Sequence, residues 1–167
     1  KFVDKAPLPV WTLGLTNNFT YKNFDLSIFF TGQLGQYVYS NTANAFFTAG
    51  SLANGRNTTK DVPLTTEDKL NAPDVSTRFL YDASFVRLQN ITLGYNLKPN
   101  SGVFQNLRFY LTGSNLAVFT DYPFQDPEVS VPKPVTLGSQ PPVAVAGIDY
   151  TTYPRSRSFA FGINATF

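Results

Sequence analysis

Apolar and polar residues alternate along five stretches of this chain, and long irregular segments separate the stretches into groups. From Thr12 to Lys22 apolar residues occupy every second position with only Asn17 out of step, and residues 24–34 repeat the pattern with Phe29 as the exception. A period of two is typical of a β-strand with one apolar face. We therefore predict strands at about residues 12–22, 24–34, 84–98, 107–120 and 158–167.

The connections between these strands alternate between short and long. The Lys22-Asn23 turn and a brief segment containing residues 99–102 predict two hairpins, whereas residues 35–82 and 121–156 lose the period. Loops of that length are unusual in a compact domain, but outer-membrane barrels carry long extracellular loops on one rim and short turns on the other. Strands of this length, at about 3.3 Å per residue and tilted by about 45°, span roughly 25–30 Å. The fold class that we predict is all-β, an antiparallel transmembrane β-barrel fragment.

Composition supports a membrane environment and excludes a helical one. Aromatic residues make up 16% of the chain and charged residues only 14%, against about 25% in an average globular domain. No apolar run approaches the ~18 residues of a transmembrane helix. Three tyrosines near predicted strand ends, Tyr21, Tyr95 and Tyr110, are expected to belong to an interfacial belt.

Charge and side-chain chemistry exclude several classes of function. The net charge of +2 predicts no nucleic-acid partner, and the lack of Cys and His removes thiolates, imidazole bases and the commonest zinc ligands. Neighbouring carboxylates occur at Asp121, Asp126 and Glu128 and at Glu67 and Asp68, but glycoside hydrolysis needs two carboxyls held across a sugar. We predict no enzyme, no catalytic residues, no cofactor and no metal site.

The two ends of the chain suggest a segment of a larger barrel. The chain starts at Lys1 and contains no methionine, so we expect an internal or processed N-terminus. An open five-stranded piece would leave unpaired backbone groups in hydrocarbon, and it therefore needs the remainder of the same barrel as a partner.

The last strand carries a second signal. Alternating apolar residues and a glycine lead to the terminal phenylalanine, and this tail resembles the β-signal by which outer-membrane barrels are recognised for assembly; the alternative is an edge strand of a soluble sheet. The residues assigned to the assembly signal are Gly162, Ile163, Ala165 and Phe167.

Ordered motifs resemble one family of transporters. Residues Gly14–Ser27, GLTNNFTYKNFDLS, and Asp82–Tyr95, DASFVRLQNITLGY, are similar to two strand regions of the SusC/RagA-type TonB-dependent outer-membrane transporters. Thr112–Leu116, Asp126–Val129, Gly147–Asp149 and Tyr153–Arg155 follow in the family's order. Residues 1–9 and 43–64 follow no family pattern, which leaves the substrate open.

The resemblance implies an architecture, a location and partners. It implies that residues 1–167 are the C-terminal segment of a ~22-stranded barrel in the bacterial outer membrane, crossing it several times, with the plug elsewhere in the protein. The implied partners are that plug, TonB, a SusD-like surface lipoprotein, outer-membrane lipid and an imported oligosaccharide or peptide.

Four aromatic residues of the long loops are candidates for contact with that substrate: Phe46, Phe47, Tyr122 and Phe124. Their alternative role is to pack loop against loop. Two other functions also stay open from sequence, a passive porin or structural barrel without energy coupling, and a secreted carbohydrate-binding β-sandwich.

Overall fold

The chain folds into two compact units. The computed structural model describes residues 4–53, 55–60, 62, 67–68, 70, 74–99, 103–129 and 146–167. The sheet unit comprises Trp11–Leu34, Phe85–Thr120 and Arg155–Phe167. The loop unit comprises Lys1–Val10, Gly35–Ser84 and Asp121–Pro154. The predicted periodic stretches thus fall in the sheet unit, and the two long irregular segments fall in the loop unit.

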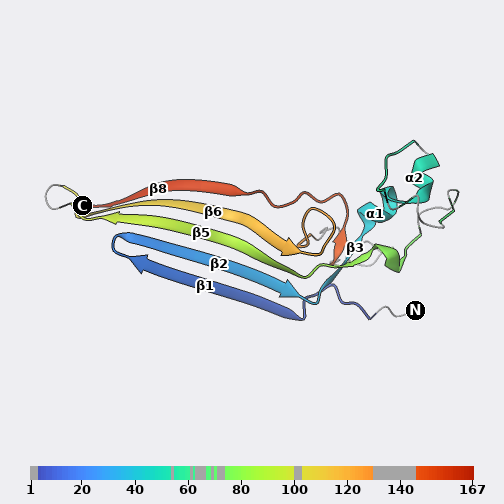
Figure 1. Cartoon of the computed structure of the whole chain (residues 1–167), viewed down its shortest axis with the longest axis horizontal. Coiled ribbons are helices and arrows are strands. Elements are labelled where there is room, and N and C mark those ends of the chain that lie inside the picture. The colour runs from blue at the N-terminus through green and yellow to red at the C-terminus, as the bar shows by residue number, and fades with distance from the viewer. Residues whose placement is uncertain are drawn as a thin grey trace, which may run out of the picture. The chain divides into compact units, whose positions relative to one another are not determined.

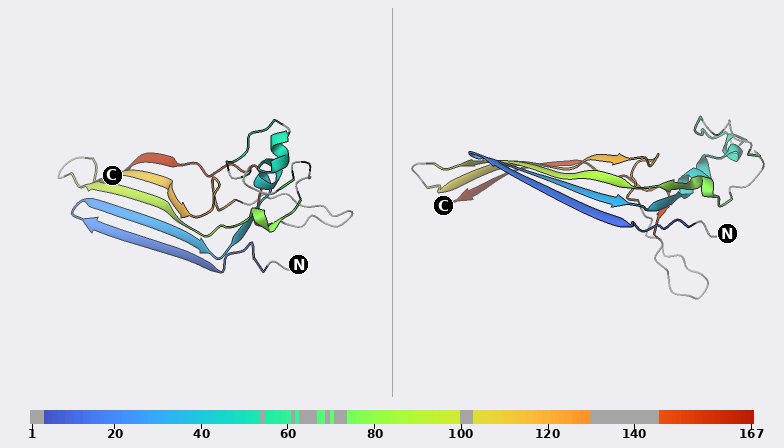
Figure 2. Two further views of the ribbon diagram at one scale, coloured as in Figure 1. Left: turned by 45° about the vertical axis from the view of Figure 1, so that its right-hand side comes forward. Right: turned by 60° about the horizontal axis from the view of Figure 1, so that its bottom comes forward.

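The sheet unit is one antiparallel sheet of five strands in the order β1-β2-β5-β6-β8 (Figure 1). Each strand begins and ends within one residue of its predicted bounds. The strands are β1 Trp11–Tyr21, β2 Phe24–Leu34, β5 Phe85–Leu97, β6 Asn106–Thr120 and β8 Ser158–Thr166. Two turned views show the five strands side by side in a single twisted layer (Figure 2).

The register places the apolar positions of all five strands on one face. Directly opposed residues of an antiparallel pair share a face, and one such row across the sheet is Phe19, Leu26, Leu93, Leu111 and Phe161. The other face is predominantly polar. A β-sandwich would cover the apolar face with a second sheet, but Phe19 and Phe161 are 57% and 68% exposed in the described chain.

A bulge interrupts the sheet at Gln89, where the alternation of the sequence weakens. The pairing of β5 shifts between Leu88 and Asn90 relative to both neighbouring strands. On β6 the irregularity includes Asn115, whose φ of 55° lies in the left-handed region that asparagine tolerates. The Asn115 side chain accepts a hydrogen bond from Arg87 and donates to the Arg155 carbonyl oxygen over 2.7 Å.

The loop unit contains short regular elements that the sequence pattern does not reveal. Strands β3 Tyr37–Ser40, β4 Leu80–Asp82 and β7 Ile148–Asp149 form a small sheet in the order β4-β3-β7, and helices α1 Asn41–Phe46 and α2 Ala49–Ala53 and the 3₁₀ turn η2 Thr77–Phe79 accompany it. Ser40 begins α1 because its hydroxyl accepts the Ala43 N–H. The interpretation of residues 35–82 as wholly irregular is therefore wrong, since elements this short show no periodicity.

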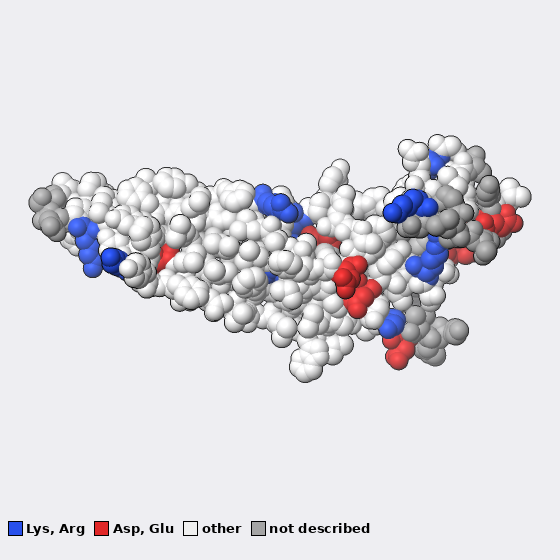
Figure 3. Space-filling view, in the orientation of Figure 1, with Lys and Arg blue, Asp and Glu red and all other residues white. Residues whose placement is uncertain are grey.

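A small core holds the loop unit together. Val38, Ala83 and Tyr122 are buried, and Tyr81 and Phe124 pack against them. Residues 100–102 and 130–145, which belong to predicted connections, lie outside the described residues. Among the described residues, no helix is long and apolar enough to cross a membrane. Charged side chains are sparse over the sheet in the view of Figure 3.

Candidate functional site

The apolar face of the sheet ends in aromatic residues near the β1–β2 turn. Tyr21 is 70% exposed and lies opposite Phe24, whose ring centroid is 4.8 Å from that of Tyr95. Tyr95 in turn lies opposite Phe109. Aromatic girdles of this kind border the apolar band of outer-membrane barrels, so Tyr21 and Tyr95 lie where an interfacial belt requires them.

Tyr110 departs from the predicted belt. It shares its row on the polar face with Gly94 and Gly162, and its ring lies so close over Gly162 that a Cβ there would collide with the phenol. The expectation that Tyr110 belongs to the belt is wrong, because its position in the alternation is polar. Gly162 therefore provides space for an aromatic ring, independently of any role in an assembly signal.

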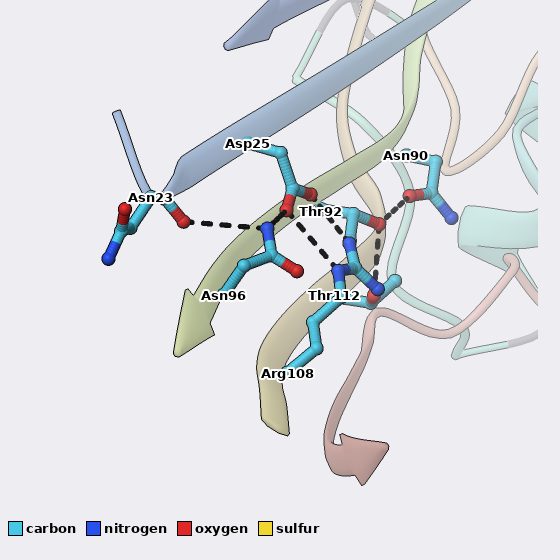
Figure 4. A network of polar contacts seen from close by, with 7 residues as sticks. All are labelled: Asn23, Asp25, Asn90, Thr92, Asn96, Arg108 and Thr112. Carbon is cyan, nitrogen blue, oxygen red and sulfur yellow. Dashed lines mark hydrogen bonds and ion pairs between the residues drawn. The ribbon is translucent and has the colours of Figure 1, made fainter. Parts of the chain in front are cut away.

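A polar network crosses three strands of the polar face (Figure 4). Arg108 of β6 donates to both carboxylate oxygens of Asp25 of β2, over 2.5 Å from Nη2 and 3.2 Å from Nε, and Asn96 of β5 donates to Oδ1 over 2.7 Å. Further along, the Thr92 and Thr112 hydroxyls lie 2.9 Å apart. A bidentate Arg–carboxylate pair is among the stronger polar interactions available.

Gly94 makes this ion pair possible. Asp25 and Arg108 lie on strands separated by β5, and Gly94 lies between them in the same row as Asp25. A Cβ on Gly94 would lie 2.5 Å from each Asp25 carboxylate oxygen and 2.7 Å from Arg108 Nη2. The pair reaches across the middle strand only because this residue has no side chain.

The candidate aromatic residues of the long loops are brought together in part. The Phe47 and Phe124 rings stack with centroids 6.2 Å apart at 17°, and Phe124 meets Tyr122 edge-on at 5.4 Å and Tyr81 at 5.3 Å. Phe46, the last residue of α1, lies instead against the Arg56 guanidinium, 5.7 Å from its carbon to the ring centroid. Loop packing thus describes Tyr122, which is 4% exposed, better than it describes Phe47.

Phe47 and Phe124 line a cavity of about 300 Å³ in the loop unit. The walls combine aromatic rings with hydroxyl, amide and carboxylate groups. The remaining lining residues are Thr42, Gln125, Asp126, Val129, Asp149, Thr151, Thr152 and Tyr153. A volume of this size lies at the lower end of the range for small-molecule sites.

Hydrogen bonds fix the polar wall of this cavity. Asp149 Oδ2 accepts from the Tyr122 hydroxyl over 2.9 Å, and Oδ1 accepts from the Thr152 hydroxyl over 2.6 Å. Burial raises the pKa of the Tyr122 phenol well above its ordinary value, and the negative charge of Asp149 raises it further. Tyr122 therefore stays protonated as a donor and holds the Asp149 carboxylate in place.

The carboxylates that the sequence placed close together have structural roles. Asp126 accepts the Glu128 N–H over 3.0 Å, and Glu67 accepts the Ala49 N–H over 3.0 Å and pairs with Arg78 over 2.8 Å. In the described ranges no group of three or more acidic, His or Cys side chains could hold a metal ion.

Sequence reasoning missed two features of these sites. Asp149 was part of a motif without an assigned role, and no local pattern connects it to Phe47. The Asp25–Arg108 pair did have a signal, since both residues occupy polar positions near predicted turns and carry opposite charges. The assigned assembly residues lie on β8 and directly after it, where Phe167 contacts Phe104 with ring centroids 5.2 Å apart. Their assembly role stays a prediction.

Comparison with known proteins gives consistent relatives. The chain is 35% identical over 173 residues to TonB-dependent receptor P3 of Formosa agariphila and 32% identical over 183 residues to TonB-dependent receptor SusC of Bacteroides thetaiotaomicron. These alignments cover 96% and 100% of this chain but only 17% and 16% of the relatives, so the chain spans about a sixth of their length. No family model matches.

Solved structures show the same fold. The RagAB peptide importer in its closed-closed state matches with a TM-score of 0.77 at 26% identity, and a second structure of the RagAB peptide transporter matches with 0.74 at 27%. Each match covers 99% of this chain and 18% of the other chain.

Proposed function

By sequence and by fold the chain is of the SusC/RagA type of TonB-dependent receptor, and on that premise we propose that it forms part of an outer-membrane transporter for nutrients. The observation that carries the proposal is the sheet with one continuous apolar face in register over five strands. Such a face suits lipid, and the opposite polar face suits the interior of a barrel.

The proposal gives the two edges of the sheet a partner. Strands β1 and β8 are the outer strands of the sheet, and in hydrocarbon their free backbone groups require pairing. We propose that the remaining strands of a ~22-stranded barrel supply it, and that a plug from the same protein closes the lumen.

The loop unit is the proposed substrate side. Its segments leave the sheet where β2 ends, β5 begins and β6 ends, which is the end opposite the short β1–β2 turn. Long loops of outer-membrane barrels are extracellular, and there the aromatic cavity would meet an oligosaccharide or a peptide. A SusD-like lipoprotein over the mouth and energy coupling through TonB complete the proposal.

Uptake by cells tests the proposed function. Cells that produce the intact protein containing this chain should accumulate a fluorescent oligosaccharide or peptide, and deletion of TonB should abolish accumulation while leaving the protein in the outer membrane. Uptake that persists without TonB would indicate a passive porin instead. A protein that is released in soluble, folded form without detergent would refute the membrane assignment.

A further inference from the structure

The cavity of the loop unit has a composition that selects among ligands. It is built from three separate parts of the chain, with Thr42 and Phe47 from the first, residues 124–129 from the second and residues 149–153 from the third. Resting on the proposed function, we propose that this cavity binds the cationic side chain of a lysine or arginine in an incoming peptide.

The charge of the cavity favours a cation. Asp126 and Asp149 line it and are only 4% and 7% exposed, and no lining residue in the described chain is Lys or Arg. The groups that donate to Asp149 are the neutral hydroxyls of Tyr122 and Thr152. Carboxylates shielded from water are costly unless an opposite charge approaches them, and an incoming ammonium or guanidinium group supplies that charge.

The aromatic walls fit the same ligand. Phe47 and Phe124 stack at 6.2 Å and present ring surface to the cavity, and Tyr153 is 94% exposed at its border. The methylene stem of a lysine or arginine packs on such rings, and the charged head group is attracted to their faces. Apolar walls with two carboxylates therefore match both parts of a long cationic side chain.

A neutral sugar fits less well. It would use the aromatic surface and the Thr42, Gln125 and Thr151 groups, but its hydroxyls would leave the charge of Asp126 and Asp149 without a counter-charge. Asp149 also already accepts two hydroxyl hydrogen bonds. Charge complementarity thus favours a peptide over an oligosaccharide at this cavity.

Calorimetric titration of the intact receptor in detergent micelles tests this inference. The ligands are the pentapeptide Ala-Ala-Lys-Ala-Ala, the same peptide with norleucine in place of lysine, and maltotriose. Norleucine keeps the methylene stem without the charge, so the ratio of the two dissociation constants measures the cationic head group alone. Hydrogen bonds to charged groups predict at least about tenfold tighter binding of the lysine peptide.

Three variants locate the effect. Asp149→Asn and Asp126→Asn each remove one cavity charge and should reduce the preference for lysine to within about threefold, and using both guards against a folding defect of either. Asp121→Asn is the matched control, because it removes one charge from an exposed residue beside Tyr122 that does not line the cavity. It should leave the preference intact, since exposed charges are screened.

The outcomes separate this inference from the proposed function. Equal affinity for both peptides, absence of lysine-peptide binding, or a lysine preference that both cavity variants retain would overturn the inference. In those cases TonB-dependent uptake of an oligosaccharide would leave the transporter proposal standing. Loss of preference in Asp121→Asn to the same extent as in the cavity variants would also overturn it, because the effect would then be one of net charge.

Discussion

Substitution of Gly94 by alanine tests the geometry of the polar face most directly. In a strand without a steric conflict, Gly→Ala is expected to stabilise, because glycine loses more backbone freedom on folding, by roughly 0.5–1 kcal/mol. At Gly94 the new Cβ would lie 2.5 Å from both Asp25 oxygens and 2.7 Å from Arg108 Nη2, so the ion pair must separate. The sign of the effect therefore distinguishes the two situations.

The expected magnitude follows from the contacts that are lost. The Asp25 and Arg108 side chains are 30% and 29% exposed, so the pair is neither fully solvated nor buried. An exposed pair contributes about 0–1 kcal/mol, and a hydrogen bond to a charged group contributes about 1.5–3 kcal/mol. Three hydrogen bonds converge on Asp25 here, and we expect Gly94→Ala to destabilise by about 1–2 kcal/mol after the gain in backbone rigidity is deducted.

Urea unfolding of the intact receptor, followed by the gel shift between folded and heated forms, measures this change. Gly14→Ala is the matched control, because its Cβ would meet only Phe29 Cε2 at an ordinary 3.8 Å. In an Asp25→Ala background the cost of Gly94→Ala should disappear, since the two substitutions remove the same interaction. A stabilising Gly94→Ala, or a cost that is unchanged in that background, would refute the reasoning.

Three further outcomes follow from the structure. Gly162→Ala should lower the yield of assembled barrel, and Tyr110→Ala should restore it if the glycine serves packing; a persistent defect would favour its role as an assembly signal. Leu15→Arg, on the apolar face, should cost about 2–4 kcal/mol on folding into lipid vesicles, whereas Thr16→Arg on the polar face should cost far less; equal costs would contradict the assignment of faces. The raised pKa of Tyr122 predicts that the loop unit loses stability as the pH rises above about 10, because only the unfolded phenol then ionises. Limited proteolysis at about pH 9 and about pH 11 should show this, and Tyr122→Phe should be less affected by the change; equal acceleration in both proteins would count against it.

Much of the sheet could be predicted because strand periodicity is local. An apolar residue at every second position marks β2 at Phe24–Leu34 without knowledge of any partner, and the Lys22-Asn23 turn fixes how β1 returns. Even the bulge at Gln89 left a signal in the weakened alternation before it. The loop unit could not be predicted in this way, since β7 has only two residues and its partner β3 is more than a hundred positions earlier.

The candidate residues show the same division. Four loop aromatics were identified by residue type, but only contacts across the fold show that Phe47 and Phe124 line the cavity, that Tyr122 is part of the core and that Phe46 packs against Arg56. Their role in substrate contact stays a prediction.

By itself, the sequence determined which residues form the five strands and which side of each strand is apolar, because both properties repeat within a few residues. Only the tertiary structure decided which side chains meet. The register across β5 brings Asp25 to Arg108, the missing side chain of Gly94 lets them touch, and the folding of distant loop segments sets Asp149 beside the Phe47–Phe124 pair. Such contacts depend on distances between residues far apart in the chain, which no local pattern of residues encodes.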